Sequence, residues 1–197
     1  MDRAGFEKSR ARLAEAFRFF EQLKLTNNCS DFESAWNGFV VNLNSVYSTL
    51  EQSVKGYPCS EAWFSREKKK RKADQALQYL WQARNSNEHS IREILVRHPG
   101  GIGIGHPSGS MFIKELRVGS EGIEHLEGWG PDGSPLEIKA YPERVELVPV
   151  FNRGQWFDPP SHFFDEELKE RTPVELASKV LAHMTYLFSD AQDLLVT

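Results

Sequence analysis

The spacing of hydrophobic residues divides the chain into stretches typical of helices and one stretch typical of strands. Apolar residues recur every three or four positions over residues 6–23, 32–54, 77–95 and 177–195, which predicts amphipathic helices with one buried face. Between residues 111 and 151, short apolar runs are separated by turn sequences rich in Gly, Pro, Asp and Ser, which favours antiparallel strands. We therefore predict a mainly α protein with a β insertion.

Two sequences of the form Ser/Thr-x-x-Glu mark predicted helix starts. Ser30 and Glu33 stand at the start of the second predicted helix, and Thr172 and Glu175 stand at the start of the last, which has Pro173 at its first position. In such a capping box the hydroxyl accepts a hydrogen bond from the amide three residues later, and the glutamate reaches back to the capping residue. Both sequences therefore predict a defined helix N-terminus.

The predicted strands interrupt a helical bundle before its last helix. Residues 1–99 would hold the first helices, the third of which ends near Pro99. Residues 100–165 would form the β-rich insertion, and residues 166–197 the helix that completes the bundle. The insertion opens with the glycine-rich residues 100–109, which lack both the G-x-G-x-x-G spacing and the lysine of a P-loop, so we expect a flexible connection there. Strands of a small antiparallel β-meander are then expected at Met111–Val118, Ile123–Leu126, Leu136–Tyr141 and Val145–Phe151.

The third predicted helix carries polar residues where its buried face should continue. Six polar residues follow one another from Arg84 to His89. At ~100° per residue, Arg84 continues the line of Trp81, while Asn85 and His89 stack four positions apart beside it. An unpaired arginine on a buried face is too costly. This face must therefore meet an anion, a partner carboxylate or an open groove.

The order Arg84-Asn85-x-x-x-His89 resembles the signature of the HEPN superfamily, whose members are helical bundles and in many cases metal-independent RNA endonucleases. The resemblance covers residues 30–97. It implies that Arg84, Asn85 and His89 form the catalytic set. Arg84 would grip the phosphate, His89 would act as general acid or base, and Asn85 would orient the imidazole. The implied reaction is attack by the ribose 2′-hydroxyl, which leaves a 2′,3′-cyclic phosphate and a 5′-hydroxyl without a metal or cofactor.

One copy of this motif converges poorly on one phosphate. Arg84 and His89 are five positions apart, about 140° around a helix. In the HEPN family two motif helices meet across a two-fold axis, so the resemblance implies a homodimer with a composite cleft. The alternative is a non-catalytic interaction module. In that reading the motif residues form a satisfied polar network, with Arg84 paired to Glu88 or to an acid of a neighbouring helix, while the insertion binds a protein partner or small ligand.

The charge distribution narrows where RNA could bind. The chain has 24 Lys and Arg against 28 Asp and Glu, a net charge of −4, so any RNA contact must come from a local patch. One run of five cations occurs, Lys68, Lys69, Lys70, Arg71 and Lys72. It is interpreted either as a solvated helix start or as an RNA-binding patch that neutralises phosphates. Lys72 precedes Arg84 by about 18 Å on a straight helix, so the run would hold the flanks of an RNA.

The remaining sequence features indicate a cytoplasmic protein. Cys29 and Cys59 fit no zinc or redox spacing, the start at Met1 carries no signal peptide, and no apolar run reaches the ~18 residues of a membrane span. We expect no metal, no cofactor and no membrane contact. The expected partners are RNA, a second copy of the chain and, for a toxin of a toxin–antitoxin or defence system, an antitoxin or other protein partner.

Overall fold

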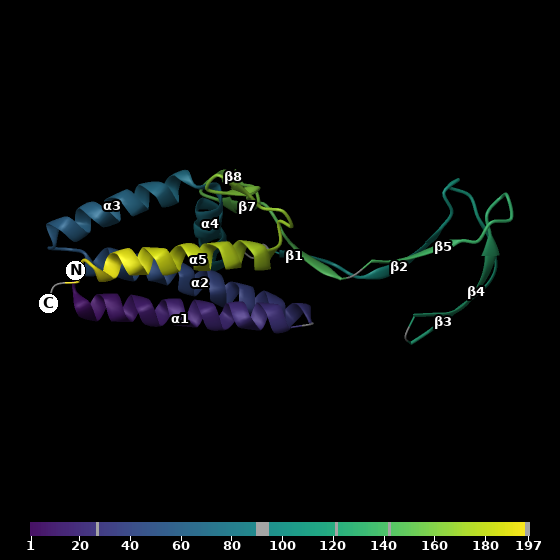
Figure 1. Ribbon diagram of the computed structural model, residues 1–197, viewed down its shortest axis with the longest axis horizontal. Coiled ribbons are helices and arrows are strands. Elements are labelled where there is room, and N and C mark those ends of the chain that lie inside the picture. The colour runs from purple at the N-terminus through teal and green to yellow at the C-terminus, as the bar shows by residue number, and fades with distance from the viewer. Residues whose placement is uncertain (27, 90–94, 121, 142, 196–197) are drawn as a thin grey trace. The chain divides into compact units, whose positions relative to one another are not determined.

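The computed structural model describes residues 1–26, 28–89, 95–120, 122–141 and 143–195. These residues form a mainly α structure with a β insertion, as predicted. The chain divides into two compact units, residues 1–96 with 145–197 and residues 97–144. The described helices are α1 (Arg3–Leu25), α2 (Cys29–Ser53), α3 (Pro58–Ala73), α4 (Gln75–His89) and α5 (Pro173–Gln192) (Figure 1).

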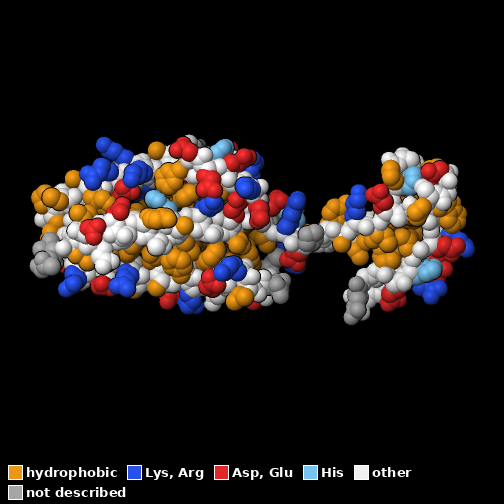
Figure 2. All heavy atoms as spheres, viewed as in Figure 1, with side chains coloured by type: hydrophobic (Ala, Val, Ile, Leu, Met, Phe, Trp, Pro, Cys, Tyr) orange, Lys and Arg blue, Asp and Glu red, His pale blue; other side chains and the backbone are white. Residues whose placement is uncertain are grey.

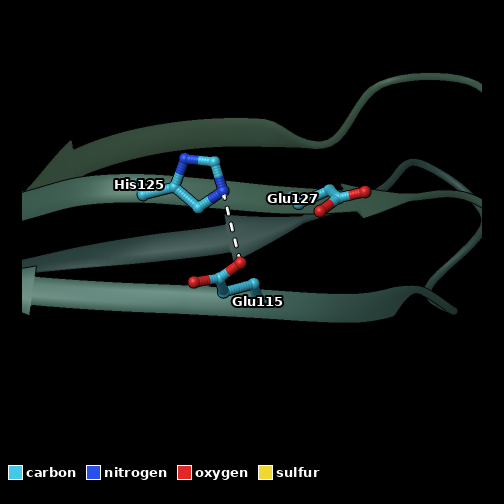
Figure 3. A group of neighbouring side chains, drawn as sticks. All are labelled: Glu115, His125 and Glu127. Atoms are coloured by element: carbon cyan, nitrogen blue, oxygen red, sulfur yellow. Dashed lines mark ion pairs between the residues drawn. The ribbon is translucent and has the colours of Figure 1, made fainter.

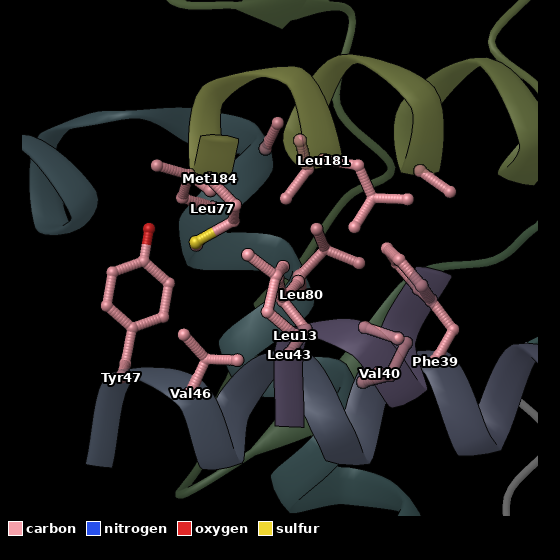
Figure 4. Close-up of a cluster of buried hydrophobic side chains, with 14 of the residues drawn as sticks. Leu13, Phe39, Val40, Leu43, Val46, Tyr47, Leu77, Leu80, Leu181 and Met184 are labelled. Atoms are coloured by element: carbon pink, nitrogen blue, oxygen red, sulfur yellow. The ribbon is translucent and has the colours of Figure 1, made fainter. Parts of the chain in front are cut away.

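The first unit is built around one hydrophobic core. The helices α1 and α2 form a hairpin, and α4 and α5 bring their apolar faces to it. The predicted helices at 6–23, 32–54 and 177–195 are confirmed, because α1, α2 and α5 cover most of these stretches and most of the residues that set the spacing are buried. Figure 4 shows part of this core, formed by Leu13, Phe39, Val40, Leu43, Val46, Tyr47, Leu77, Leu80, Leu181 and Met184.

The two predicted capping boxes fare differently. The helix α2 begins earlier than predicted, because Asn28 caps it and accepts a hydrogen bond from the Asp31 amide at 2.9 Å. Ser30 therefore lies inside the helix, and the predicted box was wrong. Thr172 does cap α5, its hydroxyl accepting from the Glu175 amide at 3.1 Å.

The glutamate of the second box has a different partner from the one predicted. The carboxylate of Glu175 accepts hydrogen bonds from the backbone amides of Lys169, Glu170 and Arg171, each at 2.9 Å. Burial opposes ionisation of this carboxyl, but the three amide donors outweigh that effect and lower its pKa. Glu175 therefore fixes the segment that leads into α5.

The third predicted helix is shorter than its apolar spacing indicated. Its described part is Gln75–His89, and Leu95–His98 form strand β1. The prediction that the helix runs to near Pro99 was therefore wrong. Strand β1 pairs with β6 (Arg144–Leu147), so hydrogen bonding to a distant part of the chain overrides the local helical periodicity.

The second unit, residues 97–144, is a set of nested strand pairs. Strand β2 (Gly101–Gly105) pairs with β5 (Glu137–Tyr141), and β3 (Phe112–Gly119) pairs with β4 (Gly122–Trp129). The predicted meander was wrong, because among the described residues of this unit only β3 and β4 are neighbours both in sequence and in a sheet.

The glycine-rich start of the insertion is a strand rather than a flexible connection. Its alternating Gly and Ile residues form a regular ladder with β5. A Cβ atom on Gly103 would lie 2.9 Å from the Tyr141 ring, so glycine leaves room for that ring. The glycines that suggested flexibility therefore allow close packing between β2 and β5.

The second unit has no hydrophobic core of its own within the part that is described. None of its described hydrophobic side chains is buried, and Figure 2 shows hydrophobic side chains at its surface. All five positions of β5 are exposed. The exposed large hydrophobic residues of this unit are Ile102, Met111, Phe112, Ile113, Leu116, Val118, Trp129, Ile138 and Tyr141.

Four further short strands belong to the first unit by their contacts: β7 (Val150–Asn152), β8 (Gln155–Phe157), β9 (His162–Phe163) and β10 (Glu166–Glu167). They pair as β7 with β8 and β9 with β10. The predicted division at 1–99, 100–165 and 166–197 stays a prediction. No helix in the described part of the chain is both long and apolar enough to cross a membrane.

Candidate functional site

The helix α4 is held in place at its start by Asp74. This residue ends α3 and precedes α4, and its side chain accepts from the Leu77 amide at 2.8 Å, as a helix N-cap does. The other carboxylate oxygen accepts from the Phe164 amide at 2.5 Å. Asp74 therefore ties α3, α4 and the segment before α5 together, and it separates Lys72 from Arg84 by a helix break rather than by one straight helix.

Hydrogen bonds to β7, to the residues before it and to α2 hold α4 in place. The hydroxyl of Tyr79 donates to the Val148 carbonyl at 2.8 Å, and the Asn152 amide donates to the Gln82 side chain at 2.6 Å. On the other side, the buried Asn44 of α2 donates to the Leu80 carbonyl at 3.3 Å. The helix is therefore held along most of its length.

The buried stripe of α4 runs beside the motif, not through it. Leu77, Leu80 and Ala83 are at most 2% exposed, and Ser86 continues their line at 3%. Trp81, Arg84 and Asn85 are half-buried. Arg84 therefore lies at the border of the buried face, which corrects the expectation that it continues the line of core residues.

Arg84 and Asn85 contact each other directly. The guanidinium Nη1 of Arg84 donates to the Asn85 side-chain oxygen at 3.2 Å. Asn85 is thus oriented with its oxygen toward the cation. The third motif residue, His89, ends α4, and its side chain lies outside the described residues. The predicted pairing of Asn85 with His89 stays a prediction.

The run of five cations lies at the end of α3, which begins at Pro58, so the run is not the start of a helix. Its members do not share one face. Lys69 is exposed, and Lys70 pairs with Glu67 at 2.7 Å. Lys68 pairs with Glu51 of α2 at 2.5 Å.

Arg71 is not a surface cation. It is 7% exposed, and its guanidinium carbon lies 4.6 Å from the centre of the Tyr47 ring and 4.2 Å from that of Trp81. Both distances are those of cation–π contacts. Burial lowers the pKa of Arg71, while Tyr47 and Glu51 act in the opposite direction.

A pocket of about 370 Å³ lies between α3 and α4, beside this contact. Its lining combines cations, amides and an aromatic ring: Glu51, Lys68, Arg71, Lys72, Gln78, Trp81 and Gln82. The cations were predicted from the sequence as RNA-binding residues, whereas the α4 residues of the lining were not. The available signal was the spacing of Gln78, Trp81, Gln82 and Asn85, which places them on one helix face.

A larger hollow, of about 550 Å³, lies at the turn between α1 and α2. No described residue that lines it is Lys, Arg or His, and it lies away from both sequence-predicted groups. The pocket between α3 and α4 is therefore the better candidate for an anionic ligand.

A second cluster of titratable residues lies on the β3–β4 pair. Donor atoms of Glu115, His125 and Glu127 lie within 4.8 Å of one another, and Figure 3 shows Glu115 and His125 facing each other. Arg117 pairs with Glu115 at 2.6 Å, and Lys114 pairs with Glu127 at 2.7 Å.

Both carboxylates of this cluster are therefore already paired with cations of β3, Glu115 within the strand and Glu127 across from it. These cross-strand and same-strand pairs are the usual stabilising contacts of an exposed β-hairpin. We assign the cluster a role in holding the β3–β4 pair together.

Comparison with known proteins gives no match from which a function could be proposed, so the proposal below rests on the residues of this chain. No protein-family model matches the chain, and no curated protein or solved structure matches it either.

Proposed function

We propose that the chain is a metal-independent RNA endonuclease of the HEPN type that acts as a homodimer. The first unit would be the HEPN-like bundle, and α4 would be the helix that meets its copy across the two-fold axis. The proposal includes a cytoplasmic role as a toxin or defence ribonuclease, held in check by an antitoxin or other protein partner.

The observation that carries the proposal is the placement of Arg84 and Asn85 together on α4. They contact each other at 3.2 Å and are half-buried, so neither is enclosed by the core. An arginine at the edge of a helix face, held by a neutral amide, is suited to bind a phosphate that reaches this face.

In the proposed reaction the ribose 2′-oxygen attacks the adjacent phosphorus, and the bond to the 5′-oxygen breaks. The 2′-hydroxyl loses a proton, and the leaving 5′-oxygen gains one. His89 is the residue type that exchanges protons near neutral pH. Because each copy of a dimer contributes one His89, a dimer can supply both a base and an acid. Arg84 would offset the charge that develops on the phosphate.

Expression in a bacterial host tests whether the chain acts as a nuclease in a cell. The proposal predicts that the wild-type chain slows growth and that His89→Ala relieves the effect. His162→Ala, at an exposed histidine of β9, is the matched control and should leave growth slow. Slow growth that persists with His89→Ala would contradict the proposal.

The non-catalytic interaction module is the second candidate, and one observation favours it. The second unit exposes nine large hydrophobic side chains and buries none among its described residues. Exposed apolar patches of this kind mark surfaces that bind other proteins. This candidate predicts RNA-independent binding of a protein partner through the second unit, unaffected by Arg84→Ala. Loss of partner binding in that variant would count against it.

A further inference from the structure

The pocket between α3 and α4 has the composition of a nucleotide site. Lys68 and Lys72 are four positions apart on α3, so they present their ammonium groups to the same side of that helix. Gln78, Trp81 and Gln82 supply amides and a ring from α4. Proteins that bind single-stranded RNA use cations to contact a phosphate, aromatic rings to stack on a base and amides to hydrogen-bond the edge of a base.

The charge of the pocket favours an anion. Lys68, Arg71 and Lys72 line it with only one carboxylate, that of Glu51. Glu51 is neutralised by its 2.5 Å ion pair with Lys68. The remaining two cations are Arg71 and the exposed Lys72, so the lining keeps a net positive charge.

The ring of Trp81 is held in place and partly exposed, as a stacking platform requires. Arg71 lies over it at 4.2 Å and is itself held by Tyr47, so the indole is fixed by a buried neighbour. Trp81 is only half-buried and lines the pocket. A base that enters the pocket therefore meets an ordered ring without having to immobilise it.

The pocket and the motif lie along the same face of α4. Asn85 is seven positions after Gln78 and four after Trp81, which puts all three on one side of the helix. Trp81 and Asn85 are about 6 Å apart along the helix axis. A strand whose scissile phosphate is at Arg84 would therefore pass over Trp81 with a neighbouring nucleotide.

We propose that this pocket binds one nucleotide of single-stranded RNA beside the cleaved bond, with its base on Trp81 and its phosphate at Lys72, next to the ion pair of Lys68 and Glu51. The proposal rests on the proposed function for the position of the cleaved bond. It assigns the pocket a role in holding the RNA chain, and it leaves the chemistry to Arg84 and His89.

The test measures binding to an RNA that cannot be cut. A fluorescent oligoribonucleotide of mixed sequence, 2′-O-methylated throughout, lacks the attacking hydroxyl, so its affinity is independent of cleavage. Trp81→Leu should weaken binding roughly tenfold, the loss expected for one stacked base, and Trp81→Phe should restore most of it. If Trp81→Leu binds like the wild type, the proposal is overturned.

The lysines are tested through the salt dependence of the same binding. Lys72→Gln should lower the slope of log affinity against log salt by about 0.7, the value for one phosphate contact with a single strand. Lys8→Gln removes the same charge from an exposed position of α1, away from the pocket lining. It is the control and should leave the slope unchanged. Equal slopes for the two variants would contradict a phosphate at this pocket.

Two further outcomes separate this proposal from its alternatives. A nucleoside monophosphate that binds as tightly as the oligonucleotide would overturn the assignment to an RNA chain and indicate a small-nucleotide site. Binding that depends on Trp81 and Lys72, in a protein that cuts no RNA, would uphold the pocket and refute the nuclease. RNA cleavage that is unchanged when Trp81 or Lys72 is replaced would uphold the nuclease and refute the pocket.

Discussion

The guanidinium of Arg71 lies 4.2 Å from the centre of the Trp81 ring, and it joins α3 to α4 at the edge of the candidate site. This contact makes a residue from a run of cations part of the protein interior. It also fixes the ring that lines the pocket. The stability of the bundle and the shape of the pocket therefore depend on the same side chain.

Replacing Arg71 should destabilise the protein. Arg71→Ala removes two cation–π contacts and the packing of a buried side chain, and we expect a loss of about 2 kcal/mol in the free energy of unfolding. Lys69→Ala, at an exposed position of the same helix, should change it by less than about 0.5 kcal/mol. Urea unfolding measures both, and equal small losses would show that Arg71 is not a structural residue.

Replacing Tyr47 by phenylalanine should not destabilise the protein. Among the described residues, the Tyr47 hydroxyl is buried and has no hydrogen-bond partner, and its burial raises the pKa of the phenol. Removing a buried hydroxyl without a partner relieves its desolvation cost, so Tyr47→Phe should be neutral or stabilising by about 1 kcal/mol. A loss of more than about 1 kcal/mol by urea unfolding would mean that the hydroxyl has a partner in solution.

Neutralising Glu175 should weaken the start of α5. Its carboxylate accepts from three backbone amides, and we expect Glu175→Gln to cost about 1–2 kcal/mol. Because the folded pKa is lowered, this stabilisation is present above the unfolded pKa of about 4.3. It is lost as the pH falls through the lower folded pKa. Unfolding at pH 7 of Glu175→Gln, with Glu170→Gln as the control, measures the effect, and equal stabilities would contradict it.

Protonation of His183 should destabilise the fold in mild acid. The imidazole packs against Phe164 with ring centres 5.1 Å apart and against Phe163. Burial lowers its pKa, Lys70 acts in the same direction, and Glu67 and Asp74 oppose them. The unfolded chain therefore binds more protons below its own pKa of about 6.5, and the free energy of unfolding falls as the pH drops below that value.

The variant His183→Gln isolates this effect. It should lose less stability than the wild type between pH 7.5 and pH 5.5, measured by urea unfolding at the two values. All other side chains are the same in the two proteins, so their contributions cancel in the comparison. An identical loss in the two proteins would show that His183 is not the group responsible.

Local sequence signals predicted α1, α2 and α5 of the first unit, whereas α3 was not predicted as a separate helix and α4 was predicted to run too far. The apolar residues of α1, α2 and α5 meet in one core, so their spacing records burial directly. The strands were located by their turns, but their partners were not predictable. A ladder between β2 and β5 depends on residues some 35 positions apart, and no local pattern encodes which strand lies beside which.

The candidate site was only partly predictable for a similar reason. The motif supplied Arg84 and Asn85, and the charge run supplied Lys68 and Lys72. Trp81 was assigned to the buried face because of its spacing, yet it is half-buried and lines the pocket. The chain turns at Asp74 between α3 and α4, and residues of both helices, rather than of either alone, line the pocket.

The most direct test of the proposed nuclease is cleavage of a mixed RNA pool in excess EDTA, with the ends of the products mapped. The wild-type chain should leave 2′,3′-cyclic phosphate and 5′-hydroxyl ends. Arg84→Ala and His89→Ala should each cut at least about 100-fold more slowly, while Arg12→Ala and His162→Ala, at exposed positions, should cut like the wild type. Equal background cleavage by all five proteins would contradict the account and favour the interaction module.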